Sequence, residues 1–131
     1  MKDRVFSGLI SSAKKARLSA HAPYSKFKVG AAVLSARGKI YTGCNVENAS
    51  YGLTLCAERS AVARMVGDGE DRIAAVAVVT DSQRPGSPCG ACRQVIAEFG
   101  PDAKIVMANL KGTVLIENLL HLLPSAFSLR R

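Results

Sequence analysis

Apolar and polar positions follow two different rhythms along the chain, and each rhythm predicts one type of element. Between Val5 and Leu18 the apolar side chains recur every three or four residues with lysine and arginine between them, which predicts an amphipathic helix. Residues 27–34 and 73–80 are instead short apolar runs between turn signals, and the second run is rich in β-branched residues. Such runs predict buried strands, and we expect residues 73–80 at the centre of a sheet with both faces covered.

The other segments continue this alternation of strands and helices. A turn at 36–39 joins the first strand to a hairpin partner at 40–44, and the polar segment 45–52 is expected to be a loop. Further helices are predicted from a Thr54 cap to Gly67, from about Cys89 to Phe99 and over 117–122, and further strands over 104–109 and 113–116. Because the first connection is a hairpin and later ones are helical crossovers, the predicted fold is α/β, a three-layer α/β/α sandwich with a mixed five-stranded sheet.

Length and composition indicate one ordinary domain. The 131 residues, of which 48% are hydrophobic, are enough for one core, so we predict a single domain over residues 1–131. No apolar run approaches the ~20 residues that cross a bilayer, and the N-terminus lacks the apolar centre of a signal peptide. We therefore expect no membrane association and a cytoplasmic location, where the four cysteines stay reduced.

The net charge of +8 raises the question of a nucleic-acid partner. The basic residues gather towards the N-terminus, with no interleaved aromatic residues and no long basic helix face. The cluster comprises Lys14, Lys15, Arg17, Lys26 and Lys28. This distribution favours a solvated surface, so we predict no nucleic-acid partner.

Three cysteines and one glutamate form the chemical centre of the sequence. Cys89 and Cys92 are separated by two residues, and Cys56 lies two positions before Glu58. Three thiolates match a tetrahedral zinc ion with one open position, where a water molecule reaches a pKa of about 7 and a nearby carboxylate moves protons. Each cysteine is expected at the start of a helix, where the dipole favours the thiolate.

Two arginines adjoin this motif. Three thiolates leave a Zn²⁺ site with a net negative charge, which weakens the metal as a Lewis acid. Arg59 and Arg93 are both candidates to donate hydrogen bonds to the sulfurs and to offset that charge.

Plainer interpretations of these residues compete with this one. A closed structural zinc site needs a fourth ligand such as His21 or His121, whose spacing to the cysteines does not fit, and it leaves Glu58 unexplained. A redox Cys-x-x-Cys gives the third cysteine no part. Cys44 has no partner at ligand spacing and is expected to be a small buried residue. Without further information, Phe27 and Phe127 are core aromatics, and Asn45 and Glu47 form a solvated turn.

The motifs together resemble the cytidine deaminases, in particular the short, homotetrameric branch that acts on free nucleosides. Four segments in order carry this resemblance across nearly the whole chain. They are Tyr24-Ser25-x-Phe27-x-Val29-Gly30-Ala31-Ala32, Gly43-Cys44-Asn45-Val46-Glu47-Asn48-Ala49, Ser87-Pro88-Cys89-Gly90-Ala91-Cys92-Arg93-Gln94 and Leu122-Leu123-Pro124-x-x-Phe127, beside Cys56-Ala57-Glu58.

The resemblance implies a role for each of these positions. Cys56, Cys89 and Cys92 hold one Zn²⁺ per subunit, and Glu58 takes the proton of the zinc-bound water and delivers it to N3 and then to the departing amine. Asn45 and Glu47 hydrogen-bond the ribose hydroxyls. Contacts to the pyrimidine come from the Phe27 ring, the Ala57 N–H and the Ser87 carbonyl, while Phe127 reaches into a neighbouring subunit's site and Tyr51 lies at the interface around the ribose.

Other functions remain open at this point. A deaminase of another aminated heterocycle, such as a blasticidin-type antibiotic, shares the zinc motif but differs around Phe27 and Asn45. A nucleic-acid deaminase more often has histidine in place of Cys56 and needs a basic, aromatic groove. A non-catalytic zinc-stabilised binding module has no need of Glu58. The sequence does not distinguish cytidine from 2′-deoxycytidine as the substrate.

Overall fold

The computed structural model describes residues 2–129 and contains one five-stranded sheet of order β2-β1-β3-β4-β5. Only β3 and β4 pair in parallel, so the sheet is mixed, as predicted. The strands are β1 (Val29–Ser35), β2 (Ile40–Cys44), β3 (Ile73–Thr80), β4 (Lys104–Asn109) and β5 (Val114–Asn118). The helices are α1 (Lys2–Arg17), the 3-10 turn η1 (Tyr51–Leu53), α2 (Ala57–Gly67), α3 (Gly90–Phe99) and α4 (Leu119–Leu122).

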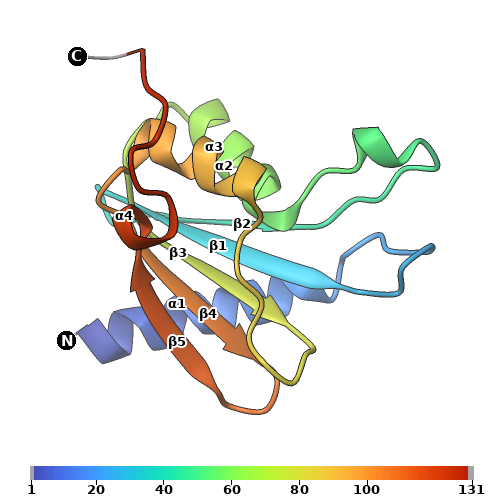
Figure 1. Cartoon of the computed structure of the whole chain (residues 1–131). Helices are drawn as coiled ribbons and strands as arrows, with labels where there is room; N and C mark the ends of the chain where they lie inside the picture. Colours follow the sequence, from blue (N-terminus) through green and yellow to red (C-terminus); the bar gives the residue numbers. More distant parts are fainter. Residues whose placement is uncertain (1, 130–131) are drawn as a thin grey trace.

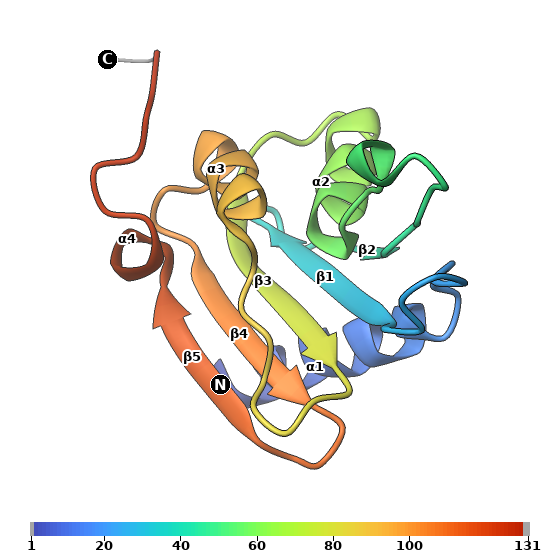
Figure 2. The ribbon, with the colours of Figure 1, turned by 45° about the vertical axis from the view of Figure 1, so that its right-hand side comes forward.

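The helices cover both faces of the sheet, which gives three layers (Figures 1 and 2). Helix α1 packs on one face, where Leu9 and Ala13 meet small side chains such as Ala32 of β1. Helices α2 and α3 pack on the other face, where Ile96 of α3 joins Val33 of β1. Since successive strand residues point to opposite faces, both faces of the central strands must be apolar. The three-layer α/β/α prediction is confirmed.

Two glycines on neighbouring strands let the helices approach the sheet closely. A Cβ on Gly30 would lie 2.0 Å from the carbonyl oxygen of Ala13 in α1. A Cβ on Gly43, on the opposite face, would lie 2.5 Å from the amide nitrogen of Ala61 and 2.6 Å from the carbonyl oxygen of Ala57 in α2. Both positions therefore require glycine, and Gly43 sets how near the first turns of α2 sit to β2.

Several element boundaries differ from the prediction. Strand β1 begins at Val29 and not at residue 27 as predicted. Lys26 adopts a φ of 63°, and the Asn45 side chain holds the backbone of residues 27 and 29 by hydrogen bonds. Helix α2 begins after Cys56, so the predicted Thr54 cap is wrong. The backbone bridge between Leu55 and Val46 keeps this segment extended, and the Thr54 hydroxyl accepts the Asn48 N–H instead.

At the C-terminal side, β5 runs to Asn118, so the last helix begins two residues later than predicted. The reason is that the ladder between β4 and β5 continues as far as the pair Lys104 and Asn118. Helix α1, in contrast, extends three residues further towards the N-terminus than the apolar pattern indicated. Within residues 2–129, no helix has both the length and the apolar character to cross a membrane.

Candidate active site

The starts of two helices bring three cysteines together. Cys56 is the N-cap residue of α2, Cys89 is the N-cap residue of α3, and Cys92 lies in the first turn of α3. Their sulfur atoms all lie within 4.8 Å of one another. Within α3 the Cys92 N–H donates to the Cys89 sulfur at 3.4 Å, which satisfies one of the helix's unpaired amides.

The chemistry of these three donors fits zinc. The hydrogen bond from the Cys92 thiol, helped by Arg59, lowers the pKa of Cys56 to about 5. The same hydrogen bond raises the pKa of Cys92 well above its ordinary value. Three sulfurs that lie this close, one of them on a thiol with a lowered pKa, can supply three thiolates to a divalent cation. Among residues 4–129, whose side chains the structure describes, no histidine or carboxylate joins the cluster, so the donor set leaves a tetrahedral ion one open position.

Glu58 lies beside the cysteines in the first turn of α2. Its side chain is only 5% exposed, so it is held inside the molecule rather than in solvent. Burial raises the pKa of this carboxyl, and the negative charge of Cys56 adds to the effect. A carboxylate whose pKa is raised accepts a proton more readily than an ordinary carboxylate, which is a property that suits a general base.

The two candidate arginines have different hydrogen-bond partners. The Nη2 atom of Arg59 donates to the Thr54 carbonyl at 3.1 Å and to the Cys56 sulfur at 3.6 Å. The thiolate of Cys56 in turn raises the pKa of Arg59. The Nε atom of Arg59 is buried and has no hydrogen-bond partner among the described residues. Arg93 contacts oxygens instead, at Ser87, Pro88 and Leu122.

Asn45 and Glu47 are buried in a loop network rather than solvated. Asn45 accepts the Val29 N–H at 2.9 Å and donates to the Phe27 carbonyl at 2.8 Å. Glu47 accepts the N–H groups of Tyr24 and Ser25 and the hydroxyl of Ser25. The hydroxyl contributes most to a lowered pKa of Glu47. A carboxylate has about four acceptor positions, so these three bonds leave Glu47 further acceptor capacity.

The aromatic candidates are exposed rather than part of the core. The Phe27 side chain is 44% exposed, although its N–H donates to Ser25 Oγ and its carbonyl accepts from Asn45. Tyr51 is exposed and meets Tyr24 edge to face, with ring centroids 6.4 Å apart. Phe127 is 70% exposed, and its carbonyl accepts a hydrogen bond from Gln94. The default interpretation of Phe27 and Phe127 as core aromatics is therefore wrong.

Comparison with known proteins shows the family to which the chain belongs. The sequence model described as "Cytidine and deoxycytidylate deaminase zinc-binding region" matches residues 6–109. This chain belongs to the cytidine and deoxycytidylate deaminases. Its zinc cofactor follows from the match to the zinc-binding region together with the cluster of Cys56, Cys89 and Cys92.

Individual members of the family are similar over nearly the whole chain. The cytidine deaminase of Sporosarcina psychrophila is 53% identical over 92% of this chain and 89% of its own. The crystal structure of cytidine deaminase from Burkholderia pseudomallei has a TM-score of 0.89 and 50% identity, and the match covers 92% of this chain and 98% of that one. The structure from Mycobacterium tuberculosis has a TM-score of 0.82 and 42% identity, over 95% and 98% of the two chains.

A blasticidin-S deaminase from Bacillus cereus is more distant. It is 31% identical to the present chain, and the match covers 79% of each of the two chains.

The remaining positions lie as follows in this deaminase. Ala57 is buried as the first residue of α2, and Ser87 is exposed in the loop before Cys89. Cys44 is half-buried, not fully buried as predicted. The Ser25 hydroxyl has a role that was not predicted from the sequence: it donates to Glu47 and accepts the Phe27 N–H, and so links the two. No local signal marks that contact, because it joins residues 22 positions apart.

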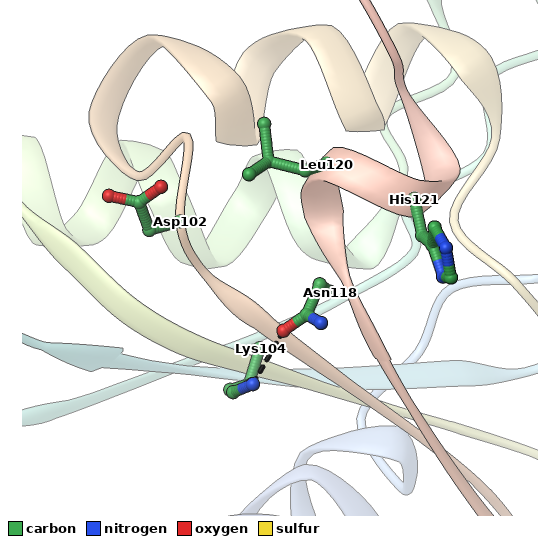
Figure 3. Close-up of a pocket in the computed structure, with 5 residues that line it drawn as sticks. All are labelled: Asp102, Lys104, Asn118, Leu120 and His121. Carbon is green, nitrogen blue, oxygen red and sulfur yellow. Dashed lines mark hydrogen bonds between the residues drawn. The ribbon is translucent and has the colours of Figure 1, made fainter.

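A surface pocket of about 370 Å³ lies away from the predicted site residues, between β4, β5 and α4 (Figure 3). Its lining residues are Asp102, Lys104, Asn118, Leu120 and His121. Two of the lining residues have partners close by: Lys104 donates to Asn118 at 2.5 Å, and His121 lies 3.2 Å from Glu117. We assign no role in the family's reaction to this pocket.

Proposed function

We propose that this chain hydrolyses cytidine, 2′-deoxycytidine or both to the corresponding uridine and ammonia, as part of pyrimidine salvage. The observation that carries the proposal is the meeting of three cysteine sulfurs within 4.8 Å, beside a buried glutamate on the same helix as Cys56. The cytidine deaminases that are at least 50% identical over most of their length support the choice of substrate.

In this proposal Cys56, Cys89 and Cys92 hold one zinc ion per subunit. When bound, zinc lowers the pKa of a water molecule in its open position and so supplies a nucleophile for C4 of the pyrimidine at neutral pH. Arg59 offsets the charge of the thiolates through its hydrogen bond to Cys56.

Glu58 moves the protons. It accepts a first proton from the attacking water and delivers it to N3. It then takes the remaining proton from the hydroxyl group on C4, which becomes the carbonyl of uridine, and delivers that proton to the amine that leaves from C4. Cytidine and water thus give uridine and ammonia, and the carboxylate is regenerated. The burial of Glu58 supports this role, because a desolvated carboxyl has the raised pKa that both transfers need.

The substrate is held by groups on three loops and at the start of α2. Asn45 and Glu47 bind the ribose hydroxyls, and the exposed ring of Phe27 packs on the pyrimidine. The Ala57 N–H and the Ser87 carbonyl contact the edge of the base. The position of Ala57 supports its part, because the first N–H of a helix has no partner within that helix and points out of its N-terminus.

We further propose that residues 1–131 form one deaminase domain that assembles as a homotetramer with shared active sites in the cytoplasm. Phe127 of one subunit then completes the site of a neighbour, with Tyr51 at the same interface. Large apolar side chains that are exposed in the single chain support an assembly: Tyr51, Leu53, Val114, Ile116, Leu120 and Phe127. The four free cysteines suit a reducing compartment. No nucleic acid or membrane takes part.

The test is the ultraviolet change when purified protein of known zinc content meets cytidine, 2′-deoxycytidine, blasticidin S or a short cytosine-containing oligonucleotide. Loss of the cytidine or deoxycytidine spectrum with an equal release of ammonia supports the proposal. Turnover of blasticidin S alone points to the antibiotic-type deaminase. Zinc-loaded protein that is inactive towards all four contradicts the proposal and favours a non-catalytic zinc module.

A further inference from the structure

Arg93 uses all three of its guanidinium nitrogens to join separate parts of the chain. Its Nε atom donates to the Pro88 carbonyl at 2.8 Å, and Nη2 donates to the Ser87 hydroxyl at 2.7 Å. Its Nη1 atom donates to the Leu122 carbonyl at 2.8 Å. Because a guanidinium is planar and rigid, three bonds of good length fix the relative positions of the groups that accept them.

The segment that Arg93 holds has no regular structure of its own. Residues 81–88 connect β3 to Cys89, and their first part is held elsewhere, where Asn109 Nδ2 donates to the carbonyls of Ser82 and Gln83. Gly86 is held by the Thr80 hydroxyl at 3.1 Å. The contacts of Arg93 reach Ser87 and Pro88, the last two residues before the metal-ligand Cys89.

We call the three hydrogen bonds of Arg93 the brace, and its Leu122 end is anchored in the core. Leu122 closes α4, and Leu119 at the start of the same helix is 1% exposed and packs with the cluster beneath α3. The carbonyl groups of a helix's last turn lack partners within the helix and carry partial negative charge, so a guanidinium is a favourable partner there. The next residue, Gln94, bonds the Phe127 carbonyl at 2.9 Å, so Arg93 and Gln94 together tie α3 to the C-terminal segment.

We propose that Arg93 is a positioning residue for the pyrimidine base: through the Ser87 hydroxyl and the Pro88 carbonyl it holds the end of the loop against α4 and so sets the affinity for substrate. The inference rests on the proposed function, in which the Ser87 carbonyl contacts the base. The inference gives the two arginines of the motifs different roles, because Arg59 donates a hydrogen bond to the Cys56 sulfur and Arg93 donates to oxygen atoms of the loop. Arg93 itself touches neither the metal ligands' sulfurs nor the reacting atoms in this assignment.

The experiment compares Arg93→Gln with Arg64→Gln as a matched control. Arg64 also bridges a helix to a distant backbone carbonyl, that of Thr42, but contacts no predicted site residue. For each zinc-loaded protein, kcat and KM for cytidine are measured together with zinc content. Arg93→Gln removes the charged donor of three hydrogen bonds, and the Ser87 and Pro88 segment is then held less firmly in the position that binds the base. We therefore expect KM for Arg93→Gln to rise about tenfold or more. Its kcat and its zinc content should each stay within about threefold of the wild-type values. For Arg64→Gln, kcat, KM and zinc content should all match those of the wild type.

Two further variants keep the proposal testable if Arg93→Gln folds poorly. Arg93→Lys retains the charge but has one donor nitrogen in place of three. Ser87→Ala removes the acceptor of Nη2 together with the hydroxyl's own bond to the Pro88 carbonyl, and leaves the other two bonds of Arg93 in place. Each variant should therefore raise KM by a smaller factor without loss of zinc. An unchanged KM in all of these variants would overturn the proposal. A fall in kcat or zinc content at constant KM would also overturn it, because that result would place Arg93 with the metal.

A measurement that does not depend on turnover separates this proposal from the proposed function. Amide hydrogen exchange in peptides covering residues 82–89 should be faster in Arg93→Gln than in the wild type and in Arg64→Gln. If the wild-type protein deaminates no nucleoside but this acceleration is present, the brace stands and the assigned reaction fails. Equal exchange rates in all three proteins would refute the brace whatever the activity.

Discussion

The guanidinium of Arg59 lies 3.6 Å from the sulfur of Cys56 and donates a hydrogen bond to it across one turn of α2. The hydrogen bond from Cys92 contributes most to the lowered pKa of the Cys56 thiol, and Arg59 adds to it through its own hydrogen bond and positive charge. The same charge is placed to offset part of the negative charge that three thiolates give to a zinc site. In the proposed function, this relationship links the charge of the cysteine cluster to the acidity of the zinc-bound water.

We expect Arg59→Gln to shift the acid limb of the kcat/KM against pH profile to higher pH by roughly one unit or more, because removing a positive charge at this distance raises the pKa of the nucleophilic water. The measurement is the pH profile at saturating zinc, with Arg64→Gln as the control. An unchanged profile together with unchanged zinc content would remove Arg59 from the mechanism.

Replacement of Glu58 separates metal binding from proton transfer. Glu58→Ala should keep its zinc and lose 10²-fold to 10⁴-fold or more in kcat, the typical effect of deleting a general acid and base. Metal analysis and turnover of cytidine on the same sample check both halves of the expectation. Glu98→Ala, a surface substitution on α3, serves as the control. Near-normal turnover in Glu58→Ala would contradict the mechanism.

Gly43 is expected to control the site through the position of α2. A Cβ at this residue meets backbone atoms of Ala57 and Ala61, so Gly43→Ala must displace the first turns of α2, which carry Glu58. Displacements near 1 Å can cost on the order of 10²-fold in rate. We therefore expect lower kcat and an altered visible spectrum of the cobalt-substituted protein, whose bands report thiolate geometry.

Gly30→Ala is the matched control for Gly43→Ala, because its Cβ meets α1 on the opposite face of the sheet. Both variants should lower the melting temperature, since each forces a helix away from its strand. Only Gly43→Ala should change the cobalt spectrum. The same spectral change in both variants would mean that the effect is general loosening of the fold.

Ser25 is expected to govern how stability falls in acid. Its hydroxyl lowers the pKa of Glu47 in the folded state. A carboxyl with a lowered folded-state pKa contributes stability that is present above its unfolded pKa, near 4.3, and is lost as pH falls through the folded value. Ser25→Ala should move that loss to higher pH. The test is melting temperature from pH 7 to pH 2.5, with the exposed Ser19→Ala as control. Coincident curves for Ser25→Ala and the wild type would refute the link.

Much of the fold follows from local pattern alone. The strand 73–80 was predicted with its observed limits, because a run of β-branched residues buried on both faces has no other stable place in a small domain. The hairpin partner at 40–44 was likewise predicted to the residue. Boundaries were misplaced where a distant contact decided them, as at Thr54, which the bridge between Val46 and Leu55 keeps outside α2.

The sequence by itself determined the chemistry of the centre. Cys89 and Cys92 lie one turn apart at the start of a helix and Glu58 lies two residues after Cys56, so spacing along the backbone already predicts which groups share a helix start. That the two helix starts meet, with the three sulfurs within 4.8 Å of one another, was decided by the tertiary structure. Only the tertiary structure decided which arginine faces sulfur, that Asn45 and Glu47 hold the loop bearing Phe27, and that Phe27 and Phe127 lie outside the core. These outcomes depend on the packing of segments that are far apart in the chain, and such contacts leave no periodic signal in the sequence.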